Sequence, residues 1–161
     1  MTTHITVTHH AEAAHRIPVL SGPGAKCRNI HGHSWHLEWT FDATGIGVEG
    51  IEFGAIKTVL RGWVDERMDH GFIGHAEDQW TKLLAADGLK VLRLPTWPTT
   101  EAIAEHLAQV TETLLPDLRL VSVLVREGHG NTAVYSPDHA PASAPDITSP
   151  TTARRTLTGR F

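Results

Sequence analysis

Two segments of the chain alternate between apolar and polar residues, which limits the structures they can form. They cover residues 3–15 and residues 31–42. Because successive side chains of a strand point to opposite faces, the alternation predicts two strands that each bury one face. One face of the second strand carries His31, His33, Trp35, Leu37, Trp39 and Phe41. This large apolar face requires other elements to cover it.

Two later segments have a helical period. From Phe53 onward, apolar residues recur at every third or fourth position, which places them along one side of a helix. They are Phe53, Ile56, Leu60, Trp63, Val64 and Met68. A second helix is predicted to begin at Thr99, which can cap it, and to end before Pro116.

The elements follow one another in the order ββααββ. Between the helices, residues 74–97 are irregular, with a short helix near residues 80–86 and an extended piece near residues 91–94. Two strands follow, at residues 118–127 and up to Tyr135. This order predicts an α+β domain with a four-stranded antiparallel sheet and two helices on one face. The open edges of such a sheet favour oligomerisation.

One domain over residues 1–136 contains these elements, and residues 137–161 form a tail rich in Pro, Ala, Ser and Thr that we expect to be mobile. The net charge is −4 with histidines neutral, and no basic stripe occurs, so nucleic acid is not an expected partner. No stretch approaches the roughly 20 apolar residues that span a bilayer, and the first residues lack a signal-peptide pattern. We therefore expect a cytoplasmic protein that has no membrane partner.

Three histidines occupy positions from which they can bind one metal ion. His31 and His33 lie two positions apart on a strand, so both imidazoles point the same way. His15 has the matching parity on the preceding strand. Three neutral imidazoles with an open fourth position are typical of a catalytic zinc site. The alternative, in a chain with 12 histidines, is that these three are ordinary half-buried side chains.

Cys27, the single cysteine, lies four residues before His31. Lys26, Arg28 and a nearby zinc ion would favour its thiolate form, which suits a nucleophile or an acid–base group. The alternatives are a fourth zinc ligand, which would close the site, and an inert core thiol.

Further polar side chains can act on a bound molecule. Asp69 can orient the neighbouring His70 ring for acid–base chemistry, although histidines are also common at helix ends. Glu127 ends a strand face of three valines, where it either grips a polar ligand or is exposed and inert. Thr99 and Thr100 are by default helix-capping residues.

Several short motifs occur in order between residues 5 and 136. They are Ala13-Ala14-His15-Arg16, Cys27 to Trp35, Ile51-Glu52-Phe53-Gly54 with Lys57, Met68-Asp69-His70, Pro98-Thr99-Thr100-Glu101, and Val123 to Glu127. Together they resemble the 6-pyruvoyltetrahydropterin synthase and 6-carboxytetrahydropterin synthase family. The resemblance implies the tunnelling fold and a homohexamer of two trimers with active sites at subunit interfaces. It also implies a pterin substrate, 7,8-dihydroneopterin triphosphate.

The same resemblance implies roles for the site residues. The implied ligands of Zn²⁺ are His15, His31 and His33. The implied catalytic residues are Cys27, Asp69, His70 and Glu127. The implied pterin-binding residues are Thr99, Thr100 and Glu127. In this scheme the zinc ion holds the side-chain hydroxyls of the substrate, Cys27 abstracts a proton, and Asp69 with His70 forms the partner acid–base relay.

The gap of three residues between Cys27 and His31 resembles the bacterial 6-carboxy branch of the family. That branch releases acetaldehyde and triphosphate in a 7-deazapurine (queuosine) pathway. Three features depart from the family pattern: Gly128 replaces a usual Thr, Glu52 replaces a usual Asp, and the segment 74–97 is longer than in compact members. These departures do not affect the predicted zinc ligands or Cys27. They affect the prediction of which substrate the site accepts.

Three other functions fit the same residues. The first is a sister enzyme that forms the 6-pyruvoyl product or shortens another pterin side chain. The second is a zinc-stabilised protein that binds a pterin or purine without turnover. The third is a redox-sensing zinc protein with Cys27 as a ligand. Substitution of Cys27 by Ala separates these classes. An enzyme would lose turnover and keep zinc, a binding protein would lose neither, and a sensor would lose zinc affinity.

Overall fold

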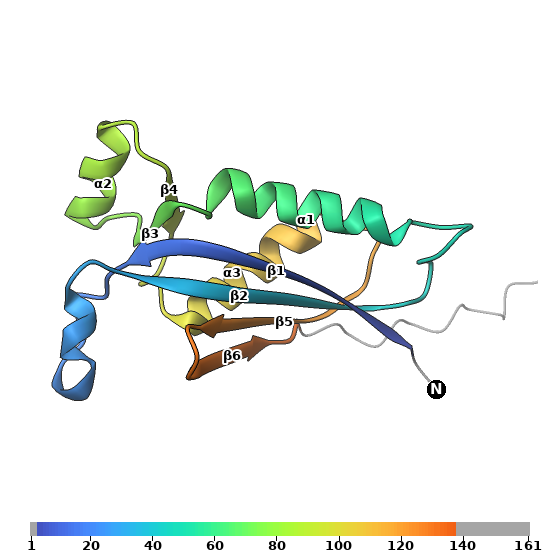
Figure 1. Cartoon of the computed structure of the whole chain (residues 1–161), viewed down its shortest axis with the longest axis horizontal. Helices are drawn as coiled ribbons and strands as arrows, with labels where there is room; N and C mark the ends of the chain where they lie inside the picture. The colour runs from blue at the N-terminus through green and yellow to red at the C-terminus, as the bar shows by residue number, and fades with distance from the viewer. Residues whose placement is uncertain (1–2, 138–161) are drawn as a thin grey trace, which may run out of the picture.

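A six-stranded sheet forms the centre of the computed structural model, which describes residues 3–137 (Figure 1). The strands are β1 (His4–His15), β2 (His31–Asp42), β3 (Gly71–His75), β4 (Val91–Leu94), β5 (Leu120–Glu127) and β6 (Asn131–Tyr135). Their order across the sheet is β4-β3-β1-β2-β5-β6. The predicted tail lies beyond Pro137, outside the described residues, so it stays a prediction.

The antiparallel part of the sheet contains the strands that the sequence predicts. β1 pairs with β2 along its whole length, from His4 opposite Asp42 to His15 opposite His31. β2 pairs with β5 and β5 with β6, also antiparallel. This continuous register keeps the odd-numbered side chains of β1 and β2 on one face, so the two alternating patterns reinforce each other.

The prediction of four strands was wrong, because two short strands extend the sheet beyond β1. β3 pairs in parallel with β1, and β4 pairs in parallel with β3, so the sheet is mixed. The three central residues of β3, Phe72, Ile73 and Gly74, are buried in succession. A strand that is buried on both faces does not alternate, so its local pattern carries no strand signal. The short helix and extended piece predicted here are confirmed as α2 (Gln79–Ala86) and β4.

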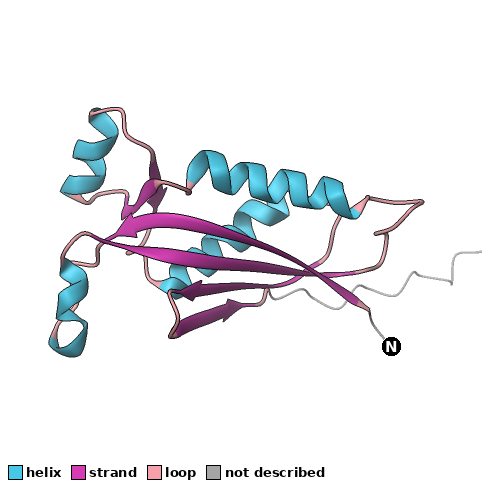
Figure 2. Cartoon of the chain, in the orientation of Figure 1, coloured by secondary structure: helices cyan, strands magenta, loops and turns pink. Residues whose placement is uncertain are grey.

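Two long helices cover one face of the sheet, as predicted, and the α+β class is confirmed (Figure 2). They are α1 (Phe53–Arg67) and α3 (Thr100–Leu114). Buried residues of both helices share one apolar core with the odd-numbered side chains of β2. Trp35, Leu37, Trp39 and Phe41 are each at most 1% exposed. Full burial of one Leu or Phe side chain stabilises a fold by about 1.5–3 kcal/mol, so this face holds both helices on the sheet.

Side chains just before α1 and α3 begin each helix. The Thr99 hydroxyl accepts a hydrogen bond from the backbone N–H of Ala102 at 3.2 Å, which confirms the predicted cap. The Glu52 carboxylate accepts one from the N–H of Gly54 at 3.0 Å, so this departure from the family pattern has a structural role. Within residues 3–137, every helix is too short or too polar to cross a membrane.

A buried ion pair joins the α2 region to the end of β1. The Arg16 guanidinium donates two hydrogen bonds to the Asp78 carboxylate, at 3.0 and 2.5 Å, and Asp78 immediately precedes α2. The rings of His75 and Trp97 stack with centroids 4.7 Å apart. These contacts hold the chain next to Pro98, whose carbonyl reaches the site described below.

Candidate metal centre

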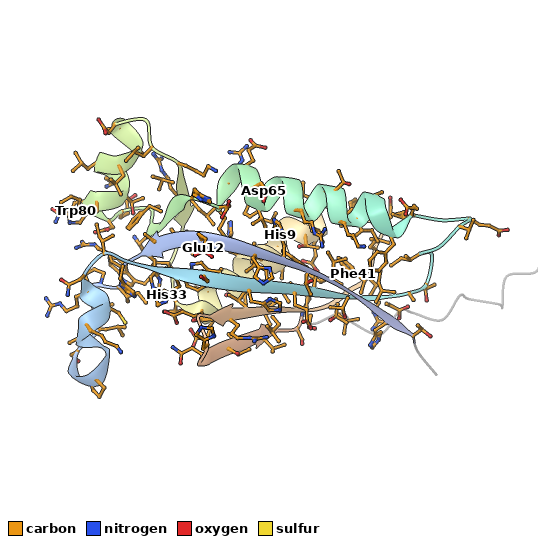
Figure 3. The ribbon with its side chains drawn as sticks, viewed as in Figure 1. His9, Glu12, His33, Phe41, Asp65 and Trp80 are labelled. Carbon is orange, nitrogen blue, oxygen red and sulfur yellow. The ribbon has the colours of Figure 1, made fainter. Side chains whose placement is uncertain are left out.

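Four side chains converge at one end of the sheet. His15 ends β1, His31 and His33 begin β2, and Glu127 ends β5, where it lies opposite Trp35. His15 lies directly opposite His31 in the register, and Figure 3 labels His33 near this end of β2. One nitrogen or oxygen of each of the four lies within 4.8 Å of the others. Parity therefore brings the three histidines together, and the pairing of β2 with β5 adds Glu127.

Backbone carbonyls fix the orientation of two of the rings. His15 Nδ1 lies 2.9 Å from the carbonyl oxygen of Pro98, and His31 Nδ1 lies 2.8 Å from that of Asn29. A carbonyl oxygen only accepts, so both Nδ1 atoms carry the proton and both Nε2 atoms present lone pairs in the neutral rings. The two Nε2 atoms face each other at 3.1 Å. Two lone pairs at this distance repel unless a cation lies between them.

The spacing of the four ligand atoms suits a small metal ion. His33 Nε2 lies 2.7 Å and His15 Nε2 lies 3.5 Å from Glu127 Oε1. In a tetrahedral zinc site with Zn–N bonds of about 2.0–2.1 Å, neighbouring ligand atoms lie about 3.3–3.4 Å apart. The observed separations bracket that value. The donor set, three imidazoles and a carboxylate, is also one that zinc accepts.

The protein environment keeps these side chains in the protonation states that bind metal. Burial lowers the pKa of His15, which is 1% exposed, and burial also lowers the pKa of His33. Burial alone would raise the pKa of Glu127, but hydrogen bonds from Asn131 and Thr100 and the nearby histidines outweigh it, so that pKa lies below its ordinary value. At neutral pH, His15 and His33 are therefore neutral and Glu127 is ionised, as metal binding requires.

Cys27 opens onto a hollow beside the metal-ligating atoms. It lies on the short 3₁₀ helix Gly22–Arg28, and its carbonyl oxygen accepts a hydrogen bond from the Ile17 N–H at 2.7 Å. The hollow has a volume of about 580 Å³ and its lining includes His15, Cys27 and Glu127. A volume of this order accommodates a bicyclic ring with a side chain. Of the three predicted metal ligands, His15 thus shares a hollow with Cys27.

Thr99 and Thr100 line the same hollow, so each has a place in the site as well as at the start of α3. The Thr100 hydroxyl donates to Glu127 Oε2 at 3.0 Å. Asn131 Nδ2 also donates to Glu127 Oε2, at 3.3 Å. Asn131 had no signal in the sequence, because only the β5–β6 turn brings it back to Glu127.

The β5–β6 turn also explains why Gly128 replaces the family's usual Thr. Its φ of 57° lies in the left-handed region, which glycine adopts without strain. From the other side of the turn, Asn131 donates a hydrogen bond to Glu127.

His70 lines a different hollow, and Asp69 lies next to it in the chain. Asp69 Oδ1 accepts a hydrogen bond from the Glu12 N–H at 2.8 Å, and Asp69 Oδ2 lies 2.7 Å from His70 Nδ1. His70 is 78% exposed and has a φ of 55°, an uncommon value for a residue other than glycine. The hollow beside it, about 390 Å³, is lined mainly by residues of the sheet face that points away from the helices, among them Ser34, and its lining also includes His33. Within one chain, the predicted relay thus does not line the hollow that contains Cys27.

The fold and the site together define a class of protein. A mixed sheet with two helices on one face brings together three histidines and a carboxylate that could hold a metal ion, and two of the four, His15 and Glu127, line the hollow that contains Cys27. A family model described as 6-pyruvoyl tetrahydropterin synthase matches residues 4–138, and the chain belongs to that enzyme family. The resemblance seen in the sequence motifs is therefore confirmed.

Named relatives agree with this assignment. The chain is 41% identical to 6-carboxy-5,6,7,8-tetrahydropterin synthase of Rickettsia bellii over 100 residues, which are 60% of this chain and 70% of that protein. It is 28% identical to the enzyme of the same name from Aquifex aeolicus over 156 residues, with 81% and 96% covered.

Two solved structures share the fold. An uncharacterized protein of Wolinella succinogenes superposes with a TM-score of 0.69 at 17% identity, covering 84% of this chain and 98% of that one. The 6-pyruvoyl tetrahydropterin synthase of Caenorhabditis elegans superposes with a TM-score of 0.61 at 19% identity, covering 85% and 96%. The predicted tunnelling fold is confirmed.

Proposed function

We propose that the protein is a zinc-dependent 6-carboxytetrahydropterin synthase. It would convert 7,8-dihydroneopterin triphosphate to 6-carboxytetrahydropterin and release acetaldehyde and triphosphate. The observation that carries this proposal is the placement of Cys27 in the same hollow as His15 and Glu127, two members of the possible metal-binding cluster. The names of the relatives from Rickettsia bellii and Aquifex aeolicus support the carboxy product over the pyruvoyl product.

His15, His31 and His33 would hold the zinc ion through their Nε2 atoms. A bound zinc ion would polarise the hydroxyl oxygens of the substrate side chain and make the adjacent C–H bonds more acidic. The Pro98 and Asn29 carbonyls support this role, because in the neutral rings they hold the proton on Nδ1 and leave the Nε2 lone pairs of His15 and His31 available.

The remaining residues would bind the ring and move protons. Glu127 would accept hydrogen bonds from the amino group and ring N–H of the pterin, and Thr100 would hold that carboxylate in place. The Cys27 thiolate would take a proton from the substrate side chain, and general acid–base groups of this kind contribute about 10²–10⁴-fold to a rate.

We further propose that Asp69 and His70 act in the site of a neighbouring copy. The pair is well ordered by Glu12, yet His70 points its ring outward and lines a hollow apart from Cys27. An exposed, oriented His–Asp pair suits a group that serves a second subunit across an interface. A homohexamer of two trimers, as the family resemblance implies, would supply such an interface.

Anaerobic incubation of the zinc-loaded protein with 7,8-dihydroneopterin triphosphate tests the function, with products identified by mass spectrometry. We expect 6-carboxytetrahydropterin and acetaldehyde. The Cys27→Ala variant should lose turnover by about 100-fold or more while it keeps its zinc content. The 6-pyruvoyl compound as sole product would move the protein to the sister activity, and unchanged substrate with zinc present would refute an enzymatic role on this substrate.

A further inference from the structure

The two oxygens of the Glu127 carboxylate lie in different environments. Oε2 accepts hydrogen bonds from Thr100 at 3.0 Å and Asn131 at 3.3 Å. Oε1 points the other way, 2.7 Å from His33 Nε2 and 3.5 Å from His15 Nε2. The side chain is only 12% exposed, so water competes little for Oε1. One oxygen is thus held by the protein, while the other faces the metal-ligating nitrogens.

The contact between Glu127 and His33 is not a hydrogen bond. His33 Nε2 is buried and has no hydrogen-bond partner among the described residues, despite its 2.7 Å distance from Oε1. An anionic oxygen and an imidazole nitrogen in this relation are satisfied together by a shared cation.

We propose that Glu127 is the fourth ligand of the metal ion in the substrate-free protein, and that binding of the pterin ring removes it from the metal. This inference rests on the proposed function, because it takes the ring-binding role of Glu127 from there. The sequence predicts an open fourth position instead. In the structure, the ion would be enclosed by His15, His31, His33 and Glu127 until a ligand arrives.

The chemistry of the pterin edge gives the reason for the exchange. That edge presents two N–H donors side by side, and a carboxylate that receives both must offer both oxygens. Oε1 faces the histidine nitrogens, so it would have to turn away from the metal to receive an N–H of the ring. One movement of the Glu127 carboxylate would therefore bind the ring and free a coordination position on the metal for the side-chain hydroxyls. A polyol that lacks the ring would leave the metal closed, which makes Glu127 a specificity-determining residue.

Cobalt substitution tests the ligand set without relying on turnover. Four protein ligands give Co²⁺ an intense, pH-independent visible spectrum, whereas a coordinated water makes the spectrum titrate, since metal-bound water ionises near neutral pH. We expect the wild-type spectrum to be constant from pH 6.5 to 8.5 and that of Glu127→Gln to titrate. Zinc affinity, measured by chelator competition, should fall about tenfold or more in Glu127→Gln. Glu101→Gln is the matched control, because Glu101 lines the same hollow outside the cluster, and its affinity should be unchanged.

A second measurement needs no variant. Addition of pterin itself, which has the ring edge without a side chain, should make the wild-type cobalt spectrum titrate like that of Glu127→Gln. Glycerol, a vicinal diol without a ring, should leave it unchanged. The inference is overturned if the ligand-free wild type already titrates, or if Glu127→Gln and Glu101→Gln bind zinc equally well. Turnover of the triphosphate substrate is assayed separately, so a failure of the proposed function would be distinguishable from a failure of this inference.

Discussion

The ion pair between Arg16 and Asp78 yields a stability prediction that follows directly from its burial. The Arg16 side chain is 15% exposed and that of Asp78 only 4%, and two parallel hydrogen bonds join them. Removing one partner of a buried pair leaves an uncompensated charge and costs about 3–5 kcal/mol. The Arg16 side chain is 15% exposed, so water can reach part of the space it leaves and the Asp78 charge stays partly solvated. For Arg16→Met we therefore expect a loss of about 2–3 kcal/mol.

The assay is thermal and denaturant unfolding at fixed protein and zinc concentrations. For a chain of this length, about 2–4 °C of Tm corresponds to 1 kcal/mol, so Tm should fall by about 4–12 °C. Arg67→Met is the matched control, because Arg67 pairs with Glu66 at the surface, with side chains 61% and 70% exposed. It should change stability by less than about 0.5 kcal/mol. The double variant Arg16→Met/Asp78→Leu should recover most of the loss, since an apolar pair leaves no buried charge.

The pH dependence gives an independent check of the same contact. The hydrogen bond from Arg16 is the main reason that the pKa of Asp78 lies below its ordinary value. The stability that the pair contributes is therefore fully present above the unfolded-state pKa of about 3.9, and it is lost as the pH falls through the folded-state value. The difference between wild type and Arg16→Met should shrink below about pH 4. An Arg16→Met variant that is as stable as Arg67→Met at pH 7 would refute the reasoning.

Three further predictions concern packing, pH and the metal. Gly74→Ala places a Cβ against both the buried Thr81 hydroxyl and the Phe72 ring, so it should cost about 1–3 kcal/mol in denaturant unfolding. The companion Thr81→Ala removes only the hydroxyl contact and should relieve part of that cost. Burial lowers the pKa of His106, so the contribution of His106 to stability is complete above about pH 6.5 and is lost below it. In His106→Gln, the fall of stability between pH 6.5 and 5 should therefore be shallower than in the wild type. An unchanged slope would contradict this. Zinc at 100-fold above its Kd should stabilise the wild type by about 2.7 kcal/mol in calorimetry, and an equal gain in His15→Ala would exclude the histidine cluster as the binding site.

Local sequence patterns were sufficient for the elements that have one face in the core. β1, β2, α1 and α3 each expose one side to solvent, so their apolar residues repeat with the period of the element. The same parity brought His15, His31 and His33 to one face. β3 had no such signal, because it is short and buried on both sides. Its parallel pairing with β1 is a long-range contact that local periodicity does not contain.

The completed site depended on contacts between residues far apart in the sequence. The sequence by itself determined which face of each strand carries the histidines, since side-chain direction is a local property of the backbone. Only the tertiary structure decided that Glu127 joins the histidines, that Asn131 holds it and that the Pro98 carbonyl orients His15. It also decided that His70 lies around a different hollow. These outcomes follow from strand register and chain crossings, which the packing of the whole core selects and no short segment specifies.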